Sequence, residues 1–213
     1  MKVAQFEFNL FGVNTYIVWD TATLEAAIVD PGMENPDECA RLKQFIERER
    51  LQVTSLINTH LHIDHTMGND YVKDVFDVGL TACADDEFLG KTRGEQAAAF
   101  HLRNAPVTPV TIDIEVKDGD KLYVGNGELT VISVPGHSPG SIALYCEKSG
   151  FVITGDALFA GSIGRTDLPG GNHSTLLNAI KTKLFTLPDS TEVLPGHGPE
   201  TTIGAEKRSN PFF

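Results

Sequence analysis

Three histidines and an aspartate lie close together in the segment NTHLHIDHTMGND, residues 58–70. His60, His62 and His65 fall within six residues, and Asp64 lies directly before the last of them. Imidazole nitrogens and carboxylate oxygens are the usual protein ligands of zinc and similar divalent ions. Both rings of the His-x-His pair can reach one ion. The side chains of Asp64 and His65 point in a different direction from that pair and could reach a second ion. The spacing therefore predicts a metal site.

Further histidines and aspartates end apolar segments elsewhere in the chain. LTVISVPGH ends at His137, FVITGD ends at Asp156, and TEVLPGH ends at His197. If these segments are neighbouring strands, their carboxyl ends meet at one edge of the sheets, where clefts of α/β folds form. Seven ligands are more than one tetrahedral ion can bind. They suit two ions about 3.5–4 Å apart that share one carboxylate. The predicted ligands are His60, His62, Asp64, His65, His137, Asp156 and His197.

The two remaining histidines, His101 and His173, lie outside this set. His101 in AAAFHL is predicted to lie on a helix face or in the core. His173 lies next to a predicted helix N-cap and is interpreted as a turn residue or a neighbour that supports the site. The glycine turns PGHSPG and LPGHG are interpreted as tight backbone bends that present an imidazole.

Hydrophobic periodicity predicts strands and helices in the first half of the chain. Residues 3–8 alternate apolar and polar side chains, which indicates a half-buried strand, and TYIVWD with EAAIVD reads as a hairpin. Residues 35–50 predict a helix with Asn35 as N-cap, Pro36 in the first turn and Glu38 at capping-box spacing. VTSLINTH predicts a strand that leads through the histidine segment into a further helix.

The second half repeats this order of strands and helices only roughly. The first half closes with residues 84–104, which predict two short helices. PVTP then breaks the helical pattern about halfway along the chain, and the second half begins. GELTVISV, the hairpin IALYCEKSGFVITGD and TEVLPGHG predict strands, and STLLNAIKTKLF predicts a helix. The whole pattern favours an α/β fold, an αββα sandwich of two mixed β-sheets with helices on the outer faces. Residues 1–213 are expected to form a single domain.

Composition excludes several classes of protein. The formal net charge of −12 disfavours nucleic acid as a partner, because such binding depends on neutralising phosphates. The N-terminus lacks a signal peptide pattern and no segment reaches transmembrane length, so no membrane partner and a cytoplasmic location are expected. Cys39, Cys83 and Cys146 are widely spaced and odd in number, which indicates free or buried thiols.

The segments THLHIDH, PGHSPGS, TGDALF and LPGHG resemble the metallo-β-lactamase fold superfamily, and most closely its hydroxyacylglutathione hydrolase (glyoxalase II) branch. The resemblance implies that His60, His62 and His137 hold a first metal. It implies that Asp64, His65 and His197 hold a second metal and that Asp156 bridges the two. Asp64 and Asp156 are the candidate catalytic residues, with Asp64 as a possible proton shuttle. Two divalent ions are expected, zinc first, with iron or manganese as alternatives.

The activity implied is hydrolysis of a small acyl thioester, of the hydroxyacylglutathione type, by a hydroxide bound between the two metals. The chain resembles the short bacterial members that lack most of the glutathione-binding C-terminal domain. Lys207 matches a basic position for the glutathione carboxylate, but Gly204 stands where its arginine partner is expected. Arg165 is a second candidate anion contact. The alternatives left open are a solvated surface position for Lys207 and a structural ion pair for Arg165. The hydrolytic β-lactamases proper often use a cysteine as a ligand at the second metal site. No cysteine of this sequence lies near a ligand motif, so β-lactam hydrolysis is not the first expectation.

Other activities remain open from the sequence. A persulfide dioxygenase of the same superfamily would use one iron, here held by His60, His137 and Asp156. A lactonase or a phosphodiesterase would keep the dinuclear site. A binding module without activity is disfavoured, because such a protein is expected to have lost ligands. The acyl group, the thiol carrier, the metal in the cell and the oligomeric state are left undetermined.

Overall fold

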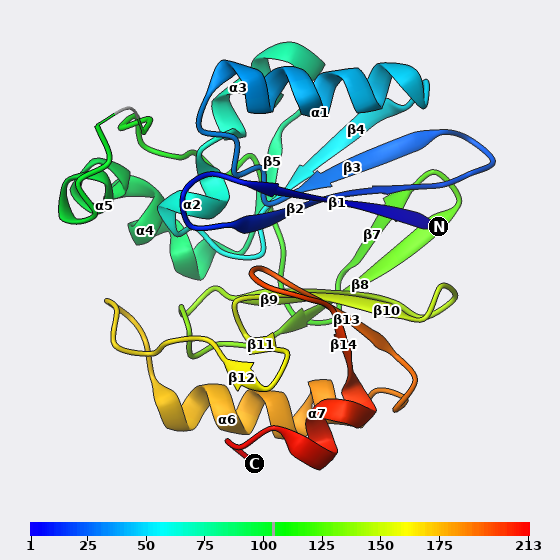
Figure 1. The fold of residues 1–213 in the computed structure, drawn as a ribbon, viewed down its shortest axis with the longest axis vertical. Coiled ribbons are helices and arrows are strands. Elements are labelled where there is room, and N and C mark those ends of the chain that lie inside the picture. The colour runs from blue at the N-terminus through cyan, green and yellow to red at the C-terminus, as the bar shows by residue number, and fades with distance from the viewer. Residues whose placement is uncertain (104) are drawn as a thin grey trace.

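The computed structural model describes residues 1–103 and 105–213, and its two six-stranded sheets face each other with helices on both outer sides (Figure 1). Each sheet contains parallel and antiparallel pairs, so both are mixed. This arrangement confirms the predicted αββα sandwich. Within these described residues, no helix is both long enough and apolar enough to cross a membrane.

The first sheet has the strand order β1-β2-β3-β4-β5-β6. The antiparallel strands β1, β2 and β3 form a meander, and β4 to β6 then continue the sheet in parallel. The strands are β1 (Lys2–Phe8), β2 (Val13–Trp19), β3 (Glu25–Val29), β4 (Gln52–Ile57), β5 (Leu80–Ala82) and β6 (Ile114–Glu115). The predicted first strand and the hairpin that follows it are thus present.

The second sheet has the strand order β14-β13-β10-β9-β8-β7. Its β10 and β13 are parallel neighbours, whereas β7, β8, β9 and β10 pair in antiparallel fashion. The strands are β7 (Lys121–Val124), β8 (Gly127–Ser133), β9 (Ile142–Cys146), β10 (Phe151–Gly155), β13 (Glu192–Pro195) and β14 (Thr201–Thr202). A separate short hairpin consists of β11 (Leu158–Phe159) and β12 (Ser162–Ile163).

Helices cover the outer face of each sheet and one end of the sandwich (Figure 1). The α-helices are α1 (Pro36–Arg48), α2 (Ile63–Thr66), α3 (Asn69–Phe76), α4 (Glu87–Lys91), α5 (Arg93–Ala99), α6 (His173–Thr182) and α7 (Ile203–Ser209). Two 3-10 turns are η1 (Ala84–Asp86) and η2 (Leu184–Thr186). The predicted segment 84–104 therefore holds two short α-helices behind a 3-10 turn, and only its last residue lies outside the described part.

Three large apolar layers hold the sandwich together. One lies under α1 and includes the buried side chains of Leu42 and Ile46. A second lies between the sheets and includes Ile57 and Leu144, and a third lies under α6 and α7 and includes Leu176. Burial of these side chains is the main favourable term for folding.

The cap of α1 differs in one detail from the prediction. Asn35 Oδ1 accepts a hydrogen bond from Glu38 N at 3.0 Å, as expected for the N-cap. The carboxylate of Glu38, however, accepts from Glu34 N at 2.7 Å and Asn9 N at 3.0 Å instead of from the cap residue. Glu38 thus fixes the turn between β1 and β2 against the start of α1, a contact that local spacing does not reveal.

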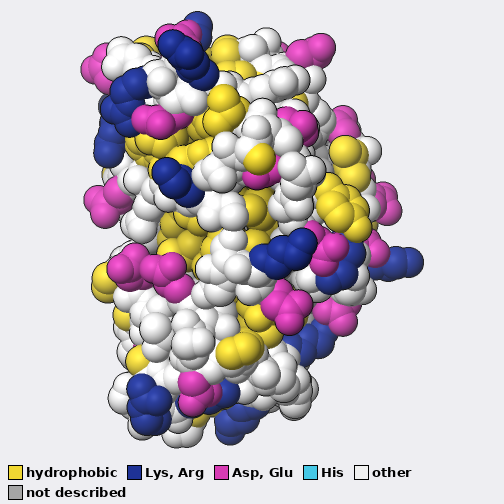
Figure 2. Space-filling model, turned by 90° about the vertical axis from the view of Figure 1, so that its right-hand side faces the viewer, with side chains coloured by type: hydrophobic (Ala, Val, Ile, Leu, Met, Phe, Trp, Pro, Cys, Tyr) yellow, Lys and Arg dark blue, Asp and Glu magenta, His cyan; other side chains and the backbone are white. Residues whose placement is uncertain are grey.

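Figure 2 shows the side of the molecule on the right of Figure 1. Acidic and basic side chains are interspersed there with apolar groups, and no described histidine is visible on this face. The histidines of the predicted site are largely buried where the two sheets meet, with His60, His65 and His137 each at most 2% exposed.

Candidate metal centre

Four loops that follow strands bring the predicted ligands together. The loop after β4 carries His60 and His62, the short helix α2 that follows it carries Asp64 and His65, and the loop after β8 carries His137. Asp156 follows β10, and His197 follows its parallel neighbour β13. Because β10 and β13 run in the same direction, their carboxyl ends present these two residues side by side.

The sheets are joined directly at the site by main-chain hydrogen bonds. Asn14 N of β2 donates to Gly196 O at 2.7 Å, and Ile142 N of β9 donates to Thr59 O at 2.9 Å. The side chain of Asn14 also donates to Pro195 O and Gly198 O, both at 2.9 Å. The loops that carry ligands from different sheets are therefore held at short range by the backbone.

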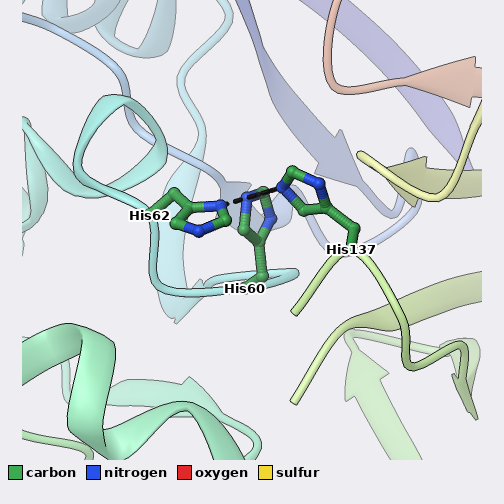
Figure 3. A group of neighbouring side chains, drawn as sticks. All are labelled: His60, His62 and His137. Atoms are coloured by element: carbon green, nitrogen blue, oxygen red, sulfur yellow. Dashed lines mark hydrogen bonds between the residues drawn. The ribbon is translucent and has the colours of Figure 1, made fainter. Parts of the chain in front are cut away.

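One group of donor atoms belongs to His60, His62 and His137, whose rings point toward one another (Figure 3). His137 Nε2 lies 3.2 Å from His60 Nε2 and 2.8 Å from His62 Nδ1. These nitrogens are separated in the sequence by about 75 positions and meet only because the two sheets face each other. Three imidazole nitrogens at this range are a suitable set for one zinc-like ion.

A second group belongs to Asp64, His65 and His197. Asp64 Oδ2 lies 3.2 Å from His197 Nε2 and 3.7 Å from His65 Nε2, and the two imidazole nitrogens are 3.3 Å apart. Asp156 lies between the groups. Its Oδ1 is 3.3 Å from His65 Nε2, and its Oδ2 is 3.6 Å from both His137 Nε2 and His197 Nε2.

The outward ring nitrogens of four histidines have fixed partners. His65 Nδ1 faces Asp30 Oδ2 at 3.0 Å, and His60 Nδ1 faces Thr59 Oγ1 at 3.1 Å. His137 Nδ1 faces Arg165 O at 2.8 Å, and His197 Nδ1 faces Phe11 O at 3.1 Å. A carbonyl oxygen accepts only, so His137 and His197 carry a proton on Nδ1. Their Nε2 lone pairs are thereby directed into the cluster, as a metal requires.

The electrostatic environment keeps two imidazoles neutral. Burial and then the neighbouring imidazoles hold the pKa of His60 well below its ordinary value of 6.5. The same two causes lower the pKa of His62 to about 3. Burial also lowers the pKa of His65, but the carboxylates of Asp156, Asp64 and Asp30 outweigh it and raise that pKa well above 6.5. Neutral imidazoles have the free lone pairs that coordinate a cation.

The carboxylates of the cluster are ionised. Burial raises the pKa of Asp156 and of Asp64, but the facing imidazoles, His65 first, outweigh burial and lower both values below 3.8. Asp156 Oδ1 is nevertheless buried without a hydrogen-bond donor. A buried carboxylate oxygen without a donor is costly unless it coordinates a cation. The residues present therefore fit a pair of divalent ions.

Close approach of the backbone makes room for the cluster. A Cβ at Gly196 would overlap Asp156 Oδ1 and lie 2.8 Å from His65 Cε1. Residue 196 therefore has to be glycine if Asp156 and His65 are to keep their positions.

Two further carboxylates support the cluster, and the sequence interpretation missed both. Asp30 accepts from Thr59 N at 2.7 Å and Thr59 Oγ1 at 2.6 Å in addition to its contact with His65. Asp86 accepts from Leu61 N, Ser138 Oγ and Gly140 N at 3.1, 2.7 and 2.6 Å. Asp30 could have been found, because EAAIVD also ends an apolar segment with an aspartate. Asp86 lies in a helical segment and has no comparable signal.

The cluster opens into a cavity of about 410 Å³. Phe11, Phe100 and Phe159 contribute to its walls together with the ligand side chains, and Phe11 and Phe100 meet edge to face at 5.6 Å. Arg165 also lines this cavity, as its predicted role requires. Its guanidinium is held by both carboxylate oxygens of Asp167 at 2.8 Å.

Lys207 lies elsewhere. It is on α7, its Nζ is 2.6 Å from Asp189 Oδ1, and it is not among the residues that line the cavity. The structure thus brings Arg165, but not Lys207, to the predicted ligands. Lys207 pairs with Asp189 instead of being solvated alone, whereas the structural ion pair that the sequence left open for Arg165 is present with Asp167.

The remaining histidines and the cysteines lie outside the cluster. His101 is exposed just beyond the end of α5, with φ of +57°, so the prediction of a helix-face or core position is wrong. The helix ends at Ala99, and Phe100 is its C-cap. His173 begins α6 directly after its N-cap, Asn172, and is not among the described residues that form the donor groups. Cys39, Cys83 and Cys146 are free, as predicted.

Comparison with known proteins places this architecture in a family. Residues 8–197 match the model of the metallo-beta-lactamase superfamily. Hydroxyacylglutathione hydrolase GloC of Haemophilus influenzae is 37% identical over 100% of this chain and 98% of its own length. The structure of the BLEG-1 B3 metallo-beta-lactamase is similar with a TM-score of 0.88, 34% identity and 99% of both chains covered.

A further solved structure, that of TTHA1623 in a di-iron-bound form, is similar with a TM-score of 0.87. It is 32% identical, and the match covers 99% of this chain and 100% of that one. The chain belongs to the metallo-beta-lactamase superfamily, whose members are in general metal-dependent hydrolases. The resemblance drawn from the four sequence motifs is thereby confirmed.

Proposed function

We propose that the protein is a dinuclear metal-dependent hydrolase that cleaves a small acyl thioester of the hydroxyacylglutathione type. The observation that carries this proposal is the pair of three-residue donor groups joined by Asp156. The similarity to GloC supports the substrate class, because that relative is named for hydrolysis of a hydroxyacylglutathione.

The proposed ligands of the first ion are His60, His62 and His137. The proposed ligands of the second ion are Asp64, His65 and His197, and the carboxylate of Asp156 serves both. Zinc is the first expectation for this donor set, and iron and manganese are alternatives that accept the same atoms. The di-iron form of TTHA1623 supports iron as one of them.

When bound, such ions would lower the pKa of a water toward neutrality and act as Lewis acids toward the carbonyl oxygen. The protein itself supplies position and proton transfer. Asp64 lines the cavity, and its carboxylate is proposed to take up the proton that the attacking water loses. The thiol leaving group has an ordinary pKa near 8.5, so it departs as a thiolate without a strong protein acid.

Arg165 is the proposed contact for an anionic group of the thiol carrier. Its guanidinium lies at the cavity edge, and Asp167 holds it in a fixed orientation. A planar guanidinium can bind a carboxylate through two parallel hydrogen bonds.

The decisive experiment combines metal analysis with a substrate panel. Two metal ions per chain and hydrolysis of S-lactoylglutathione that chelator abolishes and zinc restores are expected. The panel also includes a lactone, a phosphodiester and a chromogenic cephalosporin, the last because BLEG-1 is called a metallo-beta-lactamase. Absence of metal-dependent hydrolysis of any thioester would remove the proposal.

A second candidate is a single-iron dioxygenase that acts on a persulfide. His137 Nε2 lies 3.2 Å from His60 Nε2 and 3.6 Å from Asp156 Oδ2, so these three residues could hold one iron. The same preparation distinguishes the two candidates. One iron per chain with oxygen uptake would favour the dioxygenase, and two ions without oxygen uptake would favour the hydrolase.

A further inference from the structure

A second cavity of about 340 Å³ adjoins the cavity of the metal centre. The two cavities share His62, Phe100 and Leu168 as lining residues. The second cavity lies between α4 and α5 on one side and the loop at residues 168–169 on the other. A substrate whose reacting carbonyl faces His62 could therefore extend into it.

The walls of this second cavity are apolar. They include Phe88, Leu89, Ala99 and Pro169, and the rings of Phe88 and Phe100 remain 38% and 39% exposed. Exposed aromatic rings that gather beside a reactive centre mark a binding surface, because solvent contact with them is unfavourable. The cavity thus offers apolar area to a ligand.

Two polar side chains of the same walls, Gln96 and Thr92, are already engaged. Gln96 Oε1 accepts from Ile63 N at 3.0 Å, and Gln96 Nε2 donates to Leu89 O at 2.8 Å. Thr92 Oγ1 donates to Phe88 O at 3.0 Å. These side chains hold the wall together and have little capacity left for a ligand.

The charge of the cavity has one sign. Glu95 is exposed at its edge, and no Lys or Arg is among the described residues that line it. An anionic group would meet a carboxylate here without a compensating cation, whereas Arg165 lines the other cavity. The ligand group that fits is apolar and uncharged.

We propose that this second cavity binds the acyl chain of the substrate and that the preferred substrates are thioesters of uncharged acyl chains that are longer than acetyl and end in an apolar group. This inference rests on the proposed function. It assigns the two halves of the substrate: the acyl chain lies between α4, α5 and Leu168, and the thiol carrier lies toward Arg165.

The test is a series of acetyl, butanoyl and hexanoyl thioesters on one small neutral thiol, N-acetylcysteamine, with the metal-loaded protein. The expected result is a rise in kcat/KM of about fourfold for each added methylene, the effect of burying that group. A matched adipoyl thioester, which ends in a carboxylate, is expected to be at least tenfold poorer than the hexanoyl thioester. A flat or falling series, or equal rates for adipoyl and hexanoyl, overturns the proposal.

A matched pair of variants locates the effect. Ala99 lines the second cavity, whereas its neighbour Ala98 is also exposed and lines a different surface hollow. Ala99→Phe is expected to reduce the ratio of hexanoyl to acetyl kcat/KM to near one, and Ala98→Phe is expected to retain the ratio of the parent. The reverse result, or retention of the ratio in Ala99→Phe, contradicts the assignment.

A binding measurement separates this inference from the proposed function. Hexanamide titrated into the zinc-loaded protein is expected to shift the NMR signals of backbone amides in α4 and α5, and Ala99→Phe is expected to abolish the shifts. Binding of hexanamide without turnover of any thioester would support the second cavity as an apolar binding site and contradict the proposed thioesterase function. Turnover of acetyl and hexanoyl thioesters at equal rates, without NMR shifts on addition of hexanamide, would support the thioesterase function and contradict the proposal that the second cavity binds the acyl chain.

Discussion

At the scale of single residues, the cluster depends on side chains that are not themselves proposed ligands. Gly196 leaves space for the carboxylate of Asp156, and Asp30 faces the outward nitrogen of His65. Such supporting contacts orient the ligands and commonly change metal affinity by 10–100-fold when they are lost.

Gly196→Ala is expected to lower hydrolytic activity by about 100-fold, because an added Cβ displaces Asp156 and His65 by a large fraction of an ångström. Metal content by mass spectrometry and steady-state kinetics measure the effect. Gly94→Ala is the matched control, because its Cβ meets neighbours only at ordinary contact distances of 3.6 Å or more. Full metal content and activity in Gly196→Ala would show that the site tolerates the shift.

Arg165→Met is expected to raise KM for S-lactoylglutathione by about tenfold, the loss of one charge-assisted hydrogen bond. The increase should exceed that of Lys207→Met, because only Arg165 lines the cavity of the metal centre. Kinetics of the two variants side by side provide the comparison. A larger increase in KM in Lys207→Met than in Arg165→Met would indicate that the thiol carrier contacts Lys207 on α7 instead of Arg165.

At the scale of elements, short connections between loops and helices decide where the ligands lie. Asp86 in η1 links the loop of His60 and His62 to the loop of His137, since Leu61 N and Gly140 N both donate to it. Burial raises the pKa of Asp86, although its three donors oppose that effect. The segment before α4 thus holds together two ligand loops from different sheets.

Asp86→Ala is expected to lower the free energy of unfolding by about 3 kcal/mol, because it leaves buried donors without an acceptor. It is also expected to weaken zinc binding, since the loops of His62 and His137 lose their common anchor. Urea denaturation and zinc titration measure both effects, with the exposed neighbour Asp85→Ala as control. Unaltered zinc affinity in a destabilised Asp86→Ala would limit Asp86 to a role in folding.

The connection between α3 and the strand β6 carries a pH-dependent contact. Asp113 accepts from Lys73 Nζ at 2.5 Å and from Leu80 N at 2.7 Å, and the contact with Lys73 is the main reason that its pKa lies below the ordinary 3.8. Because the pKa is lower in the folded chain, the contribution of Asp113 to stability is present above pH 4. It is lost as the pH falls through the folded value.

The difference in unfolding free energy between the parent and Asp113→Asn is therefore expected to shrink between pH 5 and pH 2.5. Urea denaturation at several pH values measures it, with the exposed Asp74→Asn as the comparison. A difference that is constant over this range would show that Asp113 does not titrate with the fold.

At the scale of the whole molecule, the proposed ligands come from both sheets. His60 and His62 follow β4 of the first sheet, whereas His137, Asp156 and His197 follow strands of the second. A cation held by both sets would bind the folded state and not the unfolded chain, so it would stabilise the packing of one sheet on the other. The expectation that residues 1–213 form a single domain stays a prediction.

Chelation is expected to lower the midpoint of thermal unfolding by roughly 10 °C, as loss of about 4 kcal/mol of binding free energy predicts for a chain of this size. Calorimetry with and without chelator measures the shift. Leu144→Ala, which removes a buried side chain between the sheets, should lower both midpoints and preserve their difference. Equal midpoints with and without chelator would contradict a metal bridge between the sheets.

The sequence by itself determined the ligand types, the strand ends that carry them and the presence of a helix within residues 35–50, because these depend on neighbours along the chain. Glu38 shows the limit: its spacing indicated a capping box, but its carboxylate bonds Asn9 and Glu34 instead. Asp86, the place of Lys207 and the apolar second cavity were decided only by the tertiary structure. Their contacts join segments tens of residues apart, and such distances are set by how the two sheets and their helices pack, which local periodicity does not encode.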